Sequence, residues 1–142
     1  NREALLAALL LETKRDLLDR LAGAARNEQP ETALRAGIRS FAQVCERFGS
    51  LTEALIAGRL EHLFGGRAEF TEILAAILKR GTDEGVFRAD IDVPAAVSML
   101  EGTLMSGPFL RLARKRSFRL AAESITELFL RACRTSAAEP AT

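Results

Sequence analysis

The chain has no tryptophan and no tyrosine, and its 142 residues include only one histidine, two cysteines and four prolines. Nearly half of the residues are apolar (48%), so the core must consist mainly of Leu, Ala, Ile, Val and Phe. The apolar residues recur at helical spacing, and no segment alternates as a strand does. We therefore predict an all-α fold, in a chain long enough to bury roughly 68–70% of its unfolded surface in one domain.

The scarcity of histidine argues against catalytic and metal-binding sites. His62 is the sole histidine, and a di-iron bundle needs Glu-x-x-His pairs, whereas position 59 is Arg59. The sequence also lacks a Gly-x-Ser-x-Gly elbow, a phosphate-binding glycine loop and zinc-ligand spacing. We expect no enzyme activity, no metal and no cofactor. His62 then lies exposed beside Glu61, serves as a hydrogen-bonded structural residue, or contacts a ligand.

The net charge, the cysteine content and the hydropathy of the chain limit which partners and which cellular compartment the sequence is compatible with. With 20 basic and 19 acidic residues the net charge is +1, too small for the positive field that drives contact with a phosphate backbone. Cys45 and Cys133 are far apart in sequence and are interpreted as buried thiols in a reducing compartment. The longest apolar run, residues 4–11, is well short of the roughly 20 residues that span a bilayer. No signal peptide is recognisable. We therefore expect a cytoplasmic protein without a membrane partner.

Glycine, proline and capping residues divide the chain into helical segments. Gly85 can adopt the left-handed conformation that ends a helix, and Asp92 followed by Pro94 is typical of a helix start. Gly107 and Pro108 must kink or end the helix that contains them, and the sequence leaves both possibilities open for 93–113. The expected domain is 1–134, followed by a disordered tail, 135–142. Within it the expected helices are 2–25, 31–48, 50–64, 70–84, 93–113 and 117–134.

The stretch from Gly81 to Gly107 resembles the C-terminal half of TetR-family transcription regulators. In that family a helix that ends in glycine leads, through a short aromatic-containing turn, into the first of two dimerisation helices. The N-terminal residues 1–6, Asn-Arg-Glu-Ala-Leu-Leu, are similar to the junction that follows the family's recognition helix, with Arg2 where the family often has Lys. The resemblance implies a six-helix effector-binding and dimerisation domain, with the DNA-binding head absent from this chain.

The last two expected helices, 93–113 and 117–134, are apolar on two sides. One side suffices to cover a subunit's own core, so the surplus favours a second copy. The alternative is a monomer in which the helix 93–113 is simply central. The resemblance implies that this pair forms a four-helix bundle across a two-fold axis. The residues assigned to that homodimer interface are Leu104, Ile125, Leu128, Phe129 and Ala132.

Apolar residues from four of the segments are candidates for one chamber. In an ordinary helical protein they would be core, whereas the resemblance implies a small-molecule pocket between the equivalent helices. A mainly apolar lining favours a hydrophobic or aromatic effector. The assigned ligand-binding residues are Phe41, Val44, Cys45, Leu55, Arg59, His62, Leu63, Phe70, Leu74, Ile77, Met99 and Thr103.

A cluster of basic residues lies between the last two helices and includes Arg111, Arg114, Lys115, Arg116 and Arg119. It could contact phosphate, but basic residues also favour helix C-termini and solvated turns. We interpret the cluster as a solvated turn.

The resemblance implies that this chain is the effector and dimerisation part of a ligand-responsive transcriptional repressor. Its two heads would reach half-sites roughly 34–36 Å apart on operator DNA. Effector binding would tilt the helix 2–25 and so move the heads, although the sign of the response could be reversed. The alternative function is a helical protein–protein interaction module without a small-molecule ligand.

Overall fold

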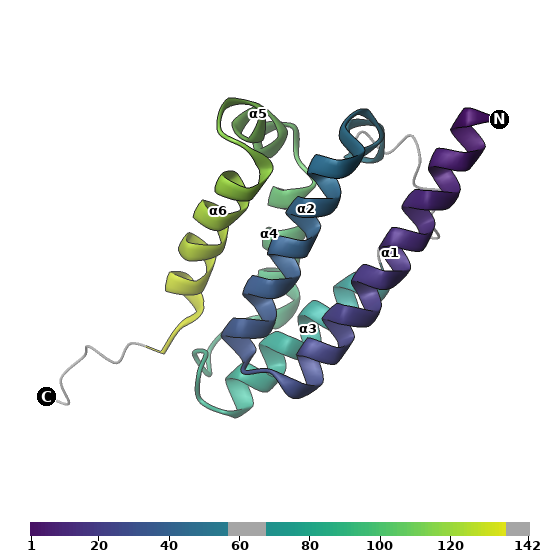
Figure 1. Cartoon of the computed structure of the whole chain (residues 1–142). Coiled ribbons are helices and arrows are strands. Elements are labelled where there is room, and N and C mark those ends of the chain that lie inside the picture. The colour runs from purple at the N-terminus through teal and green to yellow at the C-terminus, as the bar shows by residue number, and fades with distance from the viewer. Residues whose placement is uncertain (57–67, 136–142) are drawn as a thin grey trace, which may run out of the picture.

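A computed structural model describes residues 1–56 and 68–135 of the chain. This part forms six α-helices and no strand, so the predicted all-α fold class is confirmed. Figure 1 shows α2 between α1 and α6, with α3 and α4 behind it and α5 at one end. The helices are α1 (Arg2–Asn27), α2 (Pro30–Ile56), α3 (Ala68–Asp83), α4 (Val93–Leu104), α5 (Gly107–Lys115) and α6 (Phe118–Cys133).

Side-chain caps fix several of the helix starts. The Asn1 Oδ1 atom accepts a hydrogen bond from the amide of Ala4 at 2.8 Å, and α1 begins there. Asp92 accepts from the amide of Ala95 at 3.1 Å, which confirms the predicted start of α4. Just beyond the end of α3, Gly85 has a φ of 75°. Only glycine adopts this conformation without a steric cost, so the predicted end of this helix is confirmed as well.

The expected break between 31–48 and 50–64 is a kink in the structure. Gly49 leaves helical geometry, with φ of 37° and ψ of −105°, so α2 consists of two helical segments that meet at this residue, as predicted. Because glycine has no Cβ, it adopts this positive φ without a steric cost. The second segment continues to Ile56. Residues 57–64 of the expected third helix lie outside the described residues.

The possibilities left open at Gly107 and Pro108 are decided in favour of a break. Helix α4 ends at Leu104, and the Ser106 hydroxyl then caps α5 by accepting from the amide of Phe109 at 3.1 Å. Pro108 lies in the first turn of α5, where a helix needs no amide donor. The expected segment 93–113 therefore consists of two helices, α4 and α5.

Helices α1 and α2 pack against each other at a point where α2 has no side chain. A Cβ atom at Gly37 would lie 2.4 Å from Leu21 Cδ1, so the glycine permits this contact. Leu34 and Ile38 on the same helix are no more than 1% exposed and begin the core. The core continues through α3, α4 and α6, where the largest fully buried side chains are Leu74, Ile77, Leu78, Leu100, Leu104 and Leu130.

The turn between α3 and α4 closes the core with an aromatic ring. Phe87 is fully buried, and its ring lies where a Cβ on Gly81 would come within 2.2 Å of it. The Gly81 carbonyl oxygen accepts hydrogen bonds from the amide nitrogens of both Val86 and Phe87, each at 2.9 Å. The Arg88 amide donates to the carbonyl of Cys133 at 2.8 Å. This bond fixes the turn that precedes α4 to the end of α6.

The same end of α6 is held to α2 by ion pairs. Arg134 contacts Glu31 at 2.6 Å, and Arg35 contacts Glu127. The hydrogen bond from Arg35 holds the pKa of Glu127 below its ordinary value. Thr135 was expected to begin the disordered tail, but its hydroxyl donates to the carbonyl of Gly85 at 2.8 Å. Residues 136–142 of the expected tail lie outside the described part.

Candidate functional site

Part of the predicted pocket is assembled around two phenylalanines. Phe41 on α2 and Phe70 on α3 are half-buried, with ring centroids 6.4 Å apart and a tilt of 34°. The neighbouring Cys45, Leu74 and Ile77 are at most 1% exposed and pack in the interior. The structure therefore places these five predicted residues in and beside the core between α2 and α3.

Three other predicted pocket residues lie elsewhere. Met99 is 68% exposed on α4, so the structure does not place it with the buried pocket residues. Thr103 is half-buried and donates its hydroxyl to the Met99 carbonyl at 2.8 Å, within its own helix. Val44 lines a cleft between α2 and α1. The side chain of Leu55 and the whole of Arg59, His62 and Leu63 lie outside the described residues.

The misplacement of Met99 has a simple cause. Helix α4 is apolar or small on nearly every side, so its composition does not indicate which side faces inward. In the structure Val97, Leu100 and Leu104 occupy the inward side, each at most 3% exposed. Leu104, assigned to the dimer interface, therefore belongs to the core of its own subunit and has no surface to offer a second copy.

The remaining interface residues lie along the outer side of α6. Leu128 is 64% exposed and Ala132 is exposed, while Ile125 and Phe129 are half-buried against the core. The assignment missed Leu120, which is 43% exposed on the same side. Its four-residue spacing from Ser124, Leu128 and Ala132 could have revealed it. We call the row Leu120, Ser124, Leu128 and Ala132 the α6 strip.

Helix α4 runs antiparallel to α6, because the two helices are joined at both ends. Helix α5 connects them at one end, and the bond from Arg88 to Cys133 fixes the other end. Met99 is exposed on α4 and the α6 strip is exposed on α6. Each of these two C-terminal helices therefore leaves apolar surface uncovered by the described part of the subunit.

The basic cluster surrounds the junction of α5 and α6, where all five of its residues are exposed. The Arg119 amide donates to the Glu46 carboxylate at 3.2 Å, and its guanidinium pairs with Glu123 at 3.3 Å. The apolar side of α5 is buried through Phe109 and Ala113. Helix α5 therefore exposes a mainly charged side to solvent, as expected for basic residues at a solvated turn.

In residues 1–56 and 68–135, no helix combines the length and apolar character needed to cross a bilayer. Within the same ranges, no three histidine, cysteine, aspartate or glutamate side chains gather closely enough to hold a metal ion. The chain matches no protein-family model, and comparisons with curated proteins and with solved structures likewise find no match.

Proposed function

We propose that this chain is the effector-binding and dimerisation part of a TetR-like, ligand-responsive transcriptional repressor. The observation that supports the proposal most is the α6 strip together with the exposed Met99 on antiparallel α4. Two copies related by a two-fold axis would cover these surfaces with each other, as a four-helix bundle does. The interface we propose consists of the α6 strip with Ile125, Phe129 and Met99.

Helix α1 is the element that would transmit the effector signal. It packs against α2 at Leu21 and Gly37, and from there to Arg2 it extends about 28 Å at 1.5 Å per residue. Near its N-terminus Leu5 and Leu9 are exposed, at 62% and 41%. A small rotation of α1 about Leu21 would displace its N-terminus several times farther than it displaces the residues next to Leu21. Such a movement would change the spacing of DNA-binding heads placed before Asn1.

The effector we propose is hydrophobic or aromatic and enters beside Phe41 and Phe70. Both rings are half-buried and pack against the core, so an aromatic molecule could replace their mutual contact at little cost. Any displacement of Phe41 would act directly on α2, the helix against which α1 packs. Cytoplasmic residence and operator binding through the head belong to this same proposal.

The proposed interface predicts that a charged residue at position 128 weakens the dimer. Replacing Leu128 by glutamate would remove an apolar contact twice across a two-fold axis, at about 1.5–3 kcal/mol for each leucine. The dissociation constant of the dimer is therefore expected to rise about 100-fold or more. Sedimentation equilibrium at micromolar concentration measures this directly.

The matched control is Leu5→Glu, because Leu5 is 62% exposed and Leu128 is 64% exposed. The control should leave the dimer intact. A monomeric unsubstituted chain, or equal dissociation by both variants, would contradict the proposed interface. A monomer would favour the second candidate function, a helical module that uses the α6 strip to bind a different protein.

The effector is tested separately from the dimer. Aromatic compounds that raise the melting temperature should also shift the NMR signals of the Phe41 and Phe70 rings. Saturation at 100 times the dissociation constant should stabilise the fold by about 2.7 kcal/mol. If the stabilising compounds shift only signals of the α6 strip, they bind the surface and the proposed pocket is wrong.

A further inference from the structure

A cleft opens between α1 and α2 on the side of the Leu21–Gly37 contact that faces the N-terminus of α1. Figure 1 shows α1 beside α2 at its C-terminal half and leaning away toward its N-terminus. One turn beyond the Leu21–Gly37 contact, side chains of the two helices enclose about 160 Å³. A second hollow between α2 and α6 has only about 20 Å³, room for roughly one water molecule. Of the two, only the cleft between α1 and α2 has space for a solute.

The lining of this cleft is mainly polar and mixed in charge. Helix α1 contributes Thr13, Asp16 and Arg20, and α2 contributes Ser40, Gln43 and Arg47. Leu17 and Val44 add an apolar surface between them. Two guanidinium groups and one carboxylate leave a local charge of +1. The arginines come from different helices, so a molecule between them would contact both α1 and α2.

Arg20 and Arg47 have no carboxylate partner among the described residues. In this they differ from Arg35, Arg88, Arg119 and Arg134, each of which lies within 4.0 Å of a carboxylate oxygen.

Within the described ranges, Asp16, Arg20, Ser40 and Gln43 form no side-chain hydrogen bond or ion pair, although Asp16 and Arg20 are one helical turn apart. The Arg47 guanidinium lies 5.6 Å from the ring centroid of Phe48. The Thr13 hydroxyl donates to the carbonyl of Leu9 at 2.8 Å and remains able to accept a hydrogen bond. The cleft therefore offers donors and acceptors that the described residues leave unused.

We infer that this cleft binds a small oxyanion, a carboxylate or phosphate, whose negative group lies between Arg20 and Arg47. The planar guanidinium fork matches both oxyanions and forms charge-assisted hydrogen bonds with them. Ser40, Thr13 and Gln43 would bond the rest of the molecule, and Asp16 would accept from an amine or hydroxyl of it. Drug-sized ligands occupy about 300–1,000 Å³, so the occupant is smaller than these.

A ligand in this cleft would link α1 to α2 beyond the Leu21–Gly37 contact, where the two helices diverge. Drawing Arg20 and Arg47 toward one oxyanion would narrow the angle between α1 and α2. This consequence rests on the proposed function, in which the angle of α1 sets the spacing of the heads. The site itself does not depend on it, because binding requires only the cleft of a single subunit.

The test is an NMR titration of the full chain with inorganic phosphate and, separately, with succinate, each against sodium chloride of equal ionic strength. We expect saturable shifts of the Gln43 side-chain amide and of the Ser40 backbone amide with at least one probe. A response to phosphate alone assigns a phosphorylated occupant, and a response to succinate alone assigns a carboxylate. Shifts that sodium chloride reproduces in full would overturn the site.

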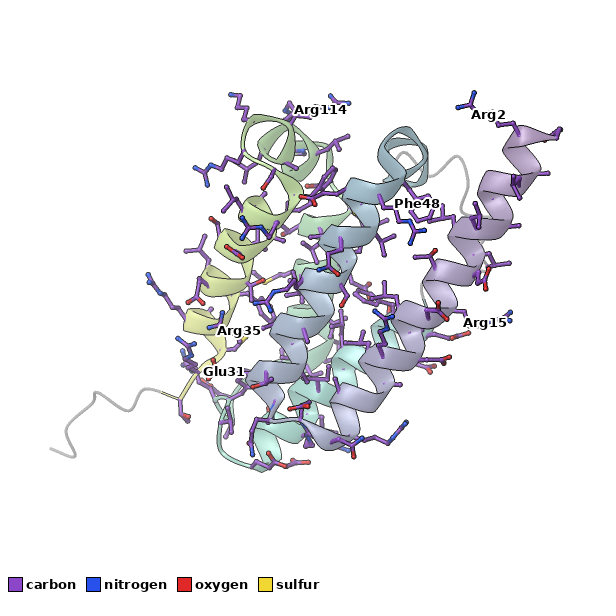
Figure 2. The ribbon with its side chains drawn as sticks, in the orientation of Figure 1. Arg2, Arg15, Glu31, Arg35, Phe48 and Arg114 are labelled. Carbon is purple, nitrogen blue, oxygen red and sulfur yellow. The ribbon has the colours of Figure 1, made fainter. Side chains whose placement is uncertain are left out.

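Arginine substitutions provide the second measurement. Arg20→Gln and Arg47→Gln should each weaken binding at least tenfold, because each removes a charge-assisted pair. Arg15→Gln is the matched control, since Arg15 is an exposed arginine of α1 that points away from α2 (Figure 2). Equal weakening by all three variants would mean a general charge effect and would overturn the site. If binding persists while the angle of α1 stays unchanged in spin-label distances, the site stands and its regulatory consequence fails.

Discussion

Replacing Phe87 by alanine is expected to lower the free energy of unfolding by about 3–5 kcal/mol, a large part of the 5–15 kcal/mol typical of a domain. The side chain is fully buried and lies in the turn that joins α3 to α4. Its loss would leave a cavity beside Gly81, which has no side chain to fill it. The neighbouring bond from Arg88 to Cys133 would weaken too, since Phe87 positions the strand-like pairing with Arg134.

Urea unfolding of both proteins at one protein concentration measures this loss. The concentration must be fixed because dimerisation would add to stability by mass action. The midpoint should fall while the slope stays the same. Phe48→Ala is a suitable control, because Phe48 is only half-buried near the end of α2, and it should cost less than half as much. An equal effect of the two substitutions would refute the special role of Phe87.

Gly81→Ala is expected to destabilise the chain although alanine favours helices. A Cβ at this position would lie 2.2 Å from one ring carbon of Phe87 and 2.4 Å from another. Because the ring is fully buried it cannot move aside cheaply, and overpacking costs about 1–3 kcal/mol. Gly23→Ala and Gly102→Ala are helical controls with open space around the added methyl group. Each control should gain up to about 1 kcal/mol in helix propensity.

A double mutant separates overpacking from other effects at Gly81. Once Phe87 is alanine, the added methyl group has room, so Gly81→Ala should cost nothing further in that background. Differential scanning calorimetry of the four proteins gives the coupling between the two sites. Additive losses would show that Gly81→Ala acts through the backbone and not through the ring.

Helix boundaries were largely predictable because they depend on near neighbours in the sequence. Asp92 caps an amide three residues away, and Gly85 ends α3 through its own backbone conformation. The predicted break at Gly49 is a kink at which one helical segment ends and the next begins, and of the two possibilities left open at Gly107 and Pro108 the structure has the end of a helix.

The candidate pocket was predicted only in part, for a related reason. Phe41 and Phe70 each lie on a helix with one clear apolar side, and their rings do meet. Met99 and Leu104 lie on a helix that is apolar nearly all round, and the inward and outward assignments were exchanged for them. The cleft between α1 and α2 could not be recognised from sequence, since its polar residues resemble any solvated helix surface.

The amino-acid order alone determined that this chain is helical, where most helices begin and end, and that its C-terminal helices are too apolar for solvent on two sides. These properties follow from interactions between residues at most four positions apart. Only the tertiary structure decided which side of α4 enters the core, that Phe87 fills the space beside Gly81, and that Arg88 bonds to Cys133. Such choices depend on the shape of helices distant along the chain, and periodicity within one helix contains no information about its neighbour.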